Sequence, residues 1–192
     1  MKKASCPPVV VGTVGAGFAA TLHGNGYARV CTVPVRLKAV ADPDLDRARK
    51  IQETYGYETA VTDFHALLND PEIDVIDILT PPVLHQSMIL EALRAGKHVI
   101  CEKPLTGFFG TPGSSGAGAV PKRVMYRQVL ENLKTIRAAA DASGRQIMYA
   151  ENFIYATPIQ RAAQLLRAKG SKILFMKGEE STPGSMSAGA GQ

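Results

Sequence analysis

The chain has 192 residues and a mass of 20.5 kDa, which suffices for one complete domain and part of a second. Its 45% hydrophobic and 20% charged residues are typical of a globular chain and exclude a disordered or coiled-coil one. The net charge of +5 arises in residues 121–192, which hold 11 basic and 5 acidic residues. Many of the basic residues lie at helical spacing between Lys122 and Arg145, which favours a solvated helix face over nucleic-acid binding.

The first half of the chain alternates between strand-like and helix-like patterns. Residues 8–14 form a β-branched run that predicts a strand, and residues 18–27 predict a helix after it. The following elements are expected to be a strand at 35–41, a helix at 45–55, a short helix at 63–68, a strand at 74–79, a helix at 83–95 and a strand at 98–101. Such alternation is typical of a doubly wound parallel sheet, so the predicted fold class is α/β.

The second half of the chain begins with an interruption of this alternation. Residues 106–122 hold repeated glycines and prolines, which predict a flexible loop. A long helix with one apolar face is then expected up to Gly144, followed by a strand at 146–149. The first domain should therefore span residues 1–150. Residues 151–192 are expected to begin a second domain, with a helix from Thr157 as N-cap to Gly170, a strand at 172–177 and a disordered tail at 181–192.

A glycine-rich turn follows the first predicted strand. Residues 15–20 read GAGFAA, the G-x-G-x-x-A form of the dinucleotide-binding motif. Gly15 allows the tight turn, Gly17 lets a pyrophosphate approach the main chain, and Ala20 lets the helix pack closely on the sheet. The residues expected to contact a dinucleotide here are Gly15, Ala16, Gly17, Phe18 and Ala19. The alternative is a purely structural turn.

Asp42 ends the second predicted strand. A carboxylate there can accept hydrogen bonds from ribose hydroxyls and would repel a 2′-phosphate, which favours NAD over NADP. One alternative is that Asp42 only caps the helix that follows. Arg47 and Arg49 keep NADP as a second possibility for the cofactor.

Two further motifs carry a resemblance to a known family. Residues 80–85 read TPPVLH, and residues 95–104 read AGKHVICEKP. Together with the glycine turn and the Ala-Asp-Pro sequence at 41–43, they closely resemble the Gfo/Idh/MocA oxidoreductases, from residue 9 to about residue 180. Members of that family join a Rossmann domain to a C-terminal α/β domain and use NAD(P) to oxidise or reduce a hydroxyl carbon of sugars and cyclitols.

The resemblance implies roles for individual residues. Thr80 and Pro81 would line the nicotinamide end of the cofactor, and His85 would start the helix beside it. Glu102 and Lys103 would lie where nicotinamide and substrate meet, with Lys103 as the catalytic residue that stabilises a developing alkoxide or relays its proton. The alternatives are an ordinary surface lysine at 103 and a helix-cap histidine at 85.

The chain also departs from the family pattern. Complete members supply further catalytic groups from the second domain, including an Asp and a His, and no such pair occurs before Gln192. His23, His65 and His98 are expected to be structural. The chain therefore resembles a truncated or fragmentary dehydrogenase, whose oligomerisation through the C-terminal sheet would depend on the missing part. The rival hypotheses are a catalytically inactive dinucleotide-binding module and, less favoured, a redox sensor.

The remaining expectations concern partners and location. No apolar run approaches the roughly 18 residues of a membrane span, and the N-terminus lacks a signal-peptide pattern, so a cytoplasmic location is expected. Cys6, Cys31 and Cys101 are too few and too widely spaced for a disulfide framework or a zinc site. We expect reduced thiols, no metal, and a small polyol or sugar as the substrate.

Overall fold

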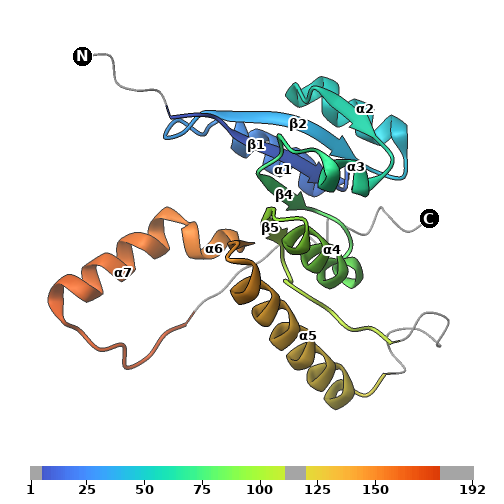
Figure 1. Cartoon of the computed structure of the whole chain (residues 1–192). Helices are drawn as coiled ribbons and strands as arrows, with labels where there is room; N and C mark the ends of the chain where they lie inside the picture. Colours follow the sequence, from blue (N-terminus) through green and yellow to red (C-terminus); the bar gives the residue numbers. More distant parts are fainter. Residues whose placement is uncertain (1–5, 111–119, 178–192) are drawn as a thin grey trace. The chain divides into compact units, whose positions relative to one another are not determined.

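A computed structural model describes residues 6–110 and 120–177 of the chain (Figure 1). By its internal contacts the chain divides after Glu151 into two units, residues 1–151 and residues 152–192. The first unit holds a sheet and its covering helices, and the second holds two helices within its described part.

The described part of the first unit contains one sheet of six parallel strands in the order β3-β2-β1-β4-β5-β6. The strands are β1 (Val9–Val14), β2 (Val35–Ala41), β3 (Thr59–Val61), β4 (Val75–Ile78), β5 (His98–Glu102) and β6 (Ile147–Ala150). Parallel neighbours need helical crossovers, and helices do connect these strands. The predicted α/β class and doubly wound parallel sheet are thereby confirmed.

Helices cover both faces of the sheet. They are α1 (Phe18–Tyr27), α2 (Leu45–Tyr55), α3 (Phe64–Asn69), α4 (Pro82–Arg94) and α5 (Lys122–Ser143). One buried cluster joins sheet residues such as Ile76 and Val99 to Ile89 of α4 and Ile136 of α5. A second cluster joins Val40 to α1 and α2. Two apolar cores thus hold the sheet between helix layers.

The packing of α1 on α2 depends on a glycine. A Cβ at Gly24 in α1 would lie 2.6 Å from the ring of Tyr55, which ends α2. The Tyr55 hydroxyl donates a hydrogen bond to the carbonyl oxygen of Thr21 at 3.1 Å. The absent side chain at residue 24 therefore makes the space in which the ring lies flat on α1.

The strand order reverses between β1 and β4. β1 pairs with β2 on one side and with β4 on the other. At their carboxyl ends, the Gly15 N–H bonds the Ala41 carbonyl at 2.8 Å and the Leu79 N–H bonds the Val14 carbonyl at 2.9 Å. In open parallel sheets such a reversal opens a crevice at the carboxyl ends of the strands, where ligands bind.

Three local predictions differ from the structure. β3 was not predicted, because its three residues pair only with β2 at one edge of the sheet. Residues 172–177 form no strand, because a strand needs a ladder partner and none of the described residues pairs with them. Thr157, the predicted N-cap, is instead the first residue of α7 (Thr157–Lys169). The N-cap of α7 is Ala156, whose side chain makes no capping hydrogen bond.

The remaining differences lie around the loop and in the second unit. A short helix, α6 (Asn152–Tyr155), precedes α7 and was not predicted. Most of the predicted flexible loop, residues 111–119, and the predicted tail at 181–192 lie outside the described residues. Helix α5 begins at Lys122, where that loop was expected to end.

Candidate functional site

The glycine turn between β1 and α1 has two positions with different requirements. Gly15 has a φ of +97°, and a Cβ there would lie 2.9 Å from the carbonyl carbon and oxygen of Leu79. Only glycine suits that backbone and that contact. A Cβ at Gly17 would meet nothing within 4 Å, although Gly17 faces the cavity described below. Gly15 thus serves the fold, whereas Gly17 leaves open space for a ligand.

Asp42 holds this turn from the neighbouring strand. One carboxylate oxygen accepts the Ala16 N–H at 2.8 Å, and the other accepts the Asp44 N–H at 2.9 Å. The N-cap of α2 is Asp44, which accepts the N–H groups of Asp46 and Arg47. The alternative in which Asp42 caps that helix is therefore wrong.

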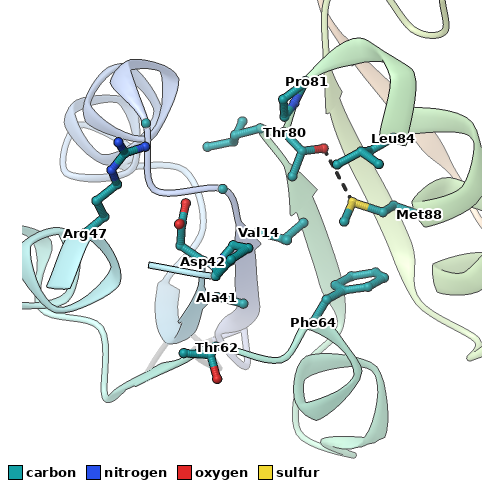
Figure 2. Close-up of a pocket in the computed structure, with 14 residues that line it drawn as sticks. Val14, Ala41, Asp42, Arg47, Thr62, Phe64, Thr80, Pro81, Leu84 and Met88 are labelled. Atoms are coloured by element: carbon teal, nitrogen blue, oxygen red, sulfur yellow. Dashed lines mark hydrogen bonds between the residues drawn. The ribbon is translucent and has the colours of Figure 1, made fainter. Parts of the chain in front are cut away.

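A cavity of about 580 Å³ opens at the carboxyl ends of β1, β2 and β4. Figure 2 shows Asp42 and Arg47 on one side of it and Thr80, Leu84 and Met88 on the other. The cavity is lined by Val14, Gly15, Gly17, Ala41, Asp42, Pro43, Arg47, Thr62, Phe64, Leu79, Thr80, Pro81, Leu84 and Met88. A mainly apolar cleft with a few converging polar groups is the usual form of a cofactor site.

The cavity brings together about half of the predicted site residues. Gly15, Gly17, Asp42, Thr80 and Pro81 line it, whereas Ala16, Phe18, Ala19, His85, Glu102 and Lys103 do not. Ala16 is a buried residue of the turn itself, and Phe18 is 58% exposed at the start of α1. The turn and the β4 end are thus assembled around one space, and the Glu-Lys-Pro motif lies outside its lining.

Several lining residues were missed by the sequence analysis. Thr62 follows β3, and Phe64 begins α3 at the same strand end. Leu84 and Met88 lie one turn apart on α4, and the Thr80 hydroxyl donates to the Met88 sulfur at 3.4 Å. Only their position in the sequence could have indicated that these residues line a site, since each follows a strand closely or lies in the first turns of the next helix.

The two arginines considered for NADP differ in position. Arg47 lines the cavity, and its Nε lies 3.2 Å from a carboxylate oxygen of Asp44. Arg49 pairs with Asp46 at 3.7 Å and is absent from the lining. Of the two, Arg47 is therefore the one placed to meet a phosphate in the cavity.

His85 occupies a different position from the expected one. Its side chain is fully buried, with Nδ1 2.8 Å from the Pro104 carbonyl oxygen and Nε2 2.7 Å from the Thr80 carbonyl oxygen. Pro81, not His85, is the N-cap of α4. Both ring nitrogens thus face main-chain oxygens, and the side chain does not line the cavity. The histidine instead ties the loop after β4 to the loop after β5.

Glu102 and Lys103 stand at the carboxyl end of β5. A Glu102 carboxylate oxygen accepts the Lys103 N–H at 2.9 Å, while the Lys103 side chain is exposed. Cys101 lies behind them in the core, where burial raises the pKa of its thiol to about 12. The ammonium of Lys103 is thus accessible, whereas the neighbouring thiol is inert.

Two further features are absent from residues 6–110 and 120–177. No group of three or more His, Cys, Asp or Glu residues there could hold a metal ion. Nor does that part of the chain include a helix with the length and apolar character needed to cross a bilayer.

Comparisons with known proteins identify one family for this chain. Residues 9–111 match the family described as oxidoreductase family, NAD-binding Rossmann fold (Gfo/Idh/MocA). A levoglucosan dehydrogenase of Pseudarthrobacter phenanthrenivorans is 37% identical over 102 residues, which are 50% of this chain and 26% of that protein. A myo-inositol 2-dehydrogenase of Thermotoga maritima is 32% identical over 96 residues, which are 50% of this chain and 28% of that protein.

Solved structures resemble the fold over more of the chain. An NAD binding oxidoreductase from Klebsiella pneumoniae superimposes with a TM-score of 0.68 and 30% identity, over 85% of this chain and 39% of that one. A levoglucosan dehydrogenase in complex with NADH and levoglucosan gives a TM-score of 0.69 and 25% identity, over 84% of this chain and 40% of that one. In these four comparisons the chain therefore covers 26% to 40% of each relative's length.

Proposed function

Since this chain belongs to the Gfo/Idh/MocA family of oxidoreductases, we propose that its cavity binds NAD(H). Together with catalytic groups beyond Lys103, this cavity would serve hydride transfer between the nicotinamide and a hydroxyl carbon of a sugar or cyclitol. Two curated relatives are dehydrogenases of levoglucosan and of myo-inositol, which supports this substrate class. A cytoplasmic location and oligomerisation through a completed C-terminal sheet stay predictions.

The observation that carries the proposal is the open space at Gly17. It lies at the N-terminus of α1, where main-chain N–H groups lack helical partners and favour an anion. The cavity extends from this point past Asp42 on one side and Thr80 on the other. A pyrophosphate at Gly17, a ribose at Asp42 and a nicotinamide toward Thr80 and Pro81 fit the residues present.

The choice between NAD and NADP depends on two side chains at the β2 end of the cavity. The carboxylate of Asp42 would accept hydrogen bonds from ribose hydroxyl groups and would repel a 2′-phosphate. Arg47 lines the same end and would attract one, but it already pairs with Asp44. We therefore propose NAD as the main cofactor, with NADP as a weaker alternative.

The chemistry that this chain contributes centres on Lys103. The bound nicotinamide would supply the hydride acceptor or donor. The exposed ammonium of Lys103 can stabilise negative charge on the reacting hydroxyl oxygen or pass its proton on. Glu102 fixes the main chain at this residue through the Lys103 N–H. Lys103 is thus the catalytic residue we propose.

The second candidate is a dinucleotide-binding module without activity of its own. It is favoured by the coverage of 26% to 40% of the four relatives described above, which leaves most of their length without a counterpart in these residues. Both candidates require cofactor binding, and they differ in turnover.

A titration of the purified chain with NADH, followed by cofactor fluorescence, tests the shared step. Saturable binding that competes with NAD⁺ is expected. Absence of saturable binding would overturn both candidates. Turnover with myo-inositol or levoglucosan would then separate a working dehydrogenase from a binding module.

A further inference from the structure

A buried polar cluster connects α1 with β4 and β5 outside the cavity lining. His23 of α1 places Nδ1 2.9 Å from a carboxylate oxygen of Asp77 on β4. Its Nε2 lies 3.4 Å from a carboxylate oxygen of Glu102 on β5. The Tyr27 hydroxyl donates to the same Asp77 oxygen at 2.8 Å. One imidazole thus bridges two carboxylates that are far apart in the sequence.

The hydrogen-bond chemistry of this bridge favours a charged ring. An ionised carboxylate only accepts hydrogen bonds, and a neutral imidazole donates through one nitrogen only. Both contacts are hydrogen bonds only when both ring nitrogens carry protons. Asp77 is fully buried, and its second carboxylate oxygen has no hydrogen-bond partner within the described chain. A buried carboxylate of this kind needs a counter-charge, which an imidazolium at residue 23 supplies.

The surrounding groups agree with this charge assignment. Burial alone would lower the pKa of His23, but the hydrogen bonds and negative charges of Asp77 and Glu102 outweigh burial and raise the pKa above its usual value of 6.5. Burial and the charge of Asp77 also raise the pKa values of Tyr27, Tyr57 and Cys101, which therefore stay neutral near pH 7. Asp77 and Glu102 are thus the charges that face the ring.

The bridge ends on the main chain of the proposed catalytic residue. Glu102 turns one carboxylate oxygen to His23 and the other to the Lys103 N–H at 2.9 Å. We propose that His23 is a positioning residue, which holds Glu102 from α1 and thereby fixes the main chain at Lys103. This inference rests on the proposed function only in giving Lys103 a catalytic role. The contact between His23, Glu102 and Lys103 stands on geometry alone.

The chain offers a matched control. His65 of α3 also lies between two carboxylates, with Nδ1 2.9 Å from Asp63 and Nε2 3.2 Å from Glu91. Its side chain is 63% exposed, against 16% for His23. His65 reproduces the local chemistry on the surface, and its two ring nitrogens contact Asp63 and Glu91 instead of Glu102. His65→Gln therefore removes an equivalent bridge without touching the proposed one.

The test follows the full chain by NMR, without cofactor, from about pH 5 to about pH 9. At the acidic end of this range both ring nitrogens of His23 should carry protons, the midpoint of the ring should lie above 6.5, and the main-chain amide signal of Lys103 should titrate with that same midpoint. His23→Gln should abolish this Lys103 titration, and His65→Gln should preserve it. Glu102→Gln should also abolish it while the His23 midpoint falls.

The outcomes separate this inference from the proposed function. A Lys103 amide signal that does not follow the His23 ring, or a Lys103 titration that survives both His23→Gln and Glu102→Gln, would overturn the inference. If His23→Gln does not fold, the more exposed Glu102→Gln decides alone. A chain that shows the coupling but does not bind NADH would keep the contact and refute the proposed function. The reverse result would keep the proposed function and refute the positioning role.

Discussion

The carboxylate of Asp42 accepts the main-chain N–H of Ala16 at 2.8 Å, which joins the end of β2 to the glycine turn after β1. The same side chain faces the cavity. Asp42 therefore stabilises the turn and, in the proposed function, also binds a ribose. Substitutions can separate the two.

Asp42→Asn keeps an acceptor for the Ala16 N–H but removes the charge, whereas Asp42→Ala removes both. We expect both variants to narrow the preference for NADH over NADPH, since repulsion of a 2′-phosphate is lost. Only the alanine variant should lose stability, by about 1–2 kcal/mol, because the buried N–H of Ala16 loses its partner. Paired cofactor titrations and urea unfolding measure these effects. An unchanged preference in the asparagine variant would deny Asp42 a role in selectivity.

Gly17→Val should weaken NADH binding by at least about tenfold, or about 1.4 kcal/mol, since the side chain would occupy the proposed pyrophosphate space. Its thermal stability should stay near that of the parent, because a Cβ at Gly17 meets nothing within 4 Å. Gly15→Ala is the contrasting variant. It should lose about 2 kcal/mol or more of stability, because its φ is +97° and its Cβ would touch the Leu79 main chain. Unchanged affinity in Gly17→Val would move the cofactor away from this turn.

The raised pKa of His23 makes stability depend on pH. A histidine whose folded pKa lies above its unfolded value of about 6.5 stabilises the fold fully below that value. The contribution is lost as the pH rises through the folded pKa. The free energy of unfolding should therefore fall as the pH rises above about 6.5.

His65 has a raised pKa as well, so this measurement belongs in the His65→Gln background. Adding His23→Gln there should flatten the dependence of the free energy of unfolding on pH. Urea unfolding at several pH values gives the slopes. An equal slope with and without His23 would show that its ionisation does not contribute to folding.

Activity is the fourth prediction. Lys103 is the only catalytic side chain that we propose in these 192 residues, while positioning and acid/base catalysis normally contribute about 7–11 kcal/mol and about 10²–10⁴ in rate. We expect the chain by itself to bind NADH without measurable oxidation of myo-inositol or glucose. Turnover above about 0.1 s⁻¹ that disappears in Lys103→Ala would contradict this expectation.

The sequence was sufficient for the elements that carry a local pattern. The turn around Gly15 and the alternation of apolar runs predicted the parallel sheet, because period and turn chemistry are local signals. β3 could not be predicted because three residues are too few to show the alternation of a strand. Residues 172–177 have the composition of a strand, but a strand forms only when it pairs with a neighbour. Composition does not show whether such a neighbour is present.

The site residues that belong to local motifs were also predictable from the sequence. Gly17, Asp42 and Thr80 belong to short local motifs, and all three line the cavity. The contacts of His23 were not visible in the sequence, since Asp77 lies 54 residues away from it and Glu102 lies 79 residues away. Side chains that act through long-range contacts give no signal in a single sequence, because only the fold sets their neighbours.

Gly24 and Tyr55 constrain each other's replacement. Glycine inside a helix costs about 1 kcal/mol relative to alanine, yet an alanine Cβ at residue 24 would lie 2.6 Å from the tyrosine ring. Alanine at 24 should therefore be tolerated only after a smaller residue has replaced Tyr55, so the order in which the two mutations arise matters. Among diverging descendants of this chain, the two positions should change as a pair.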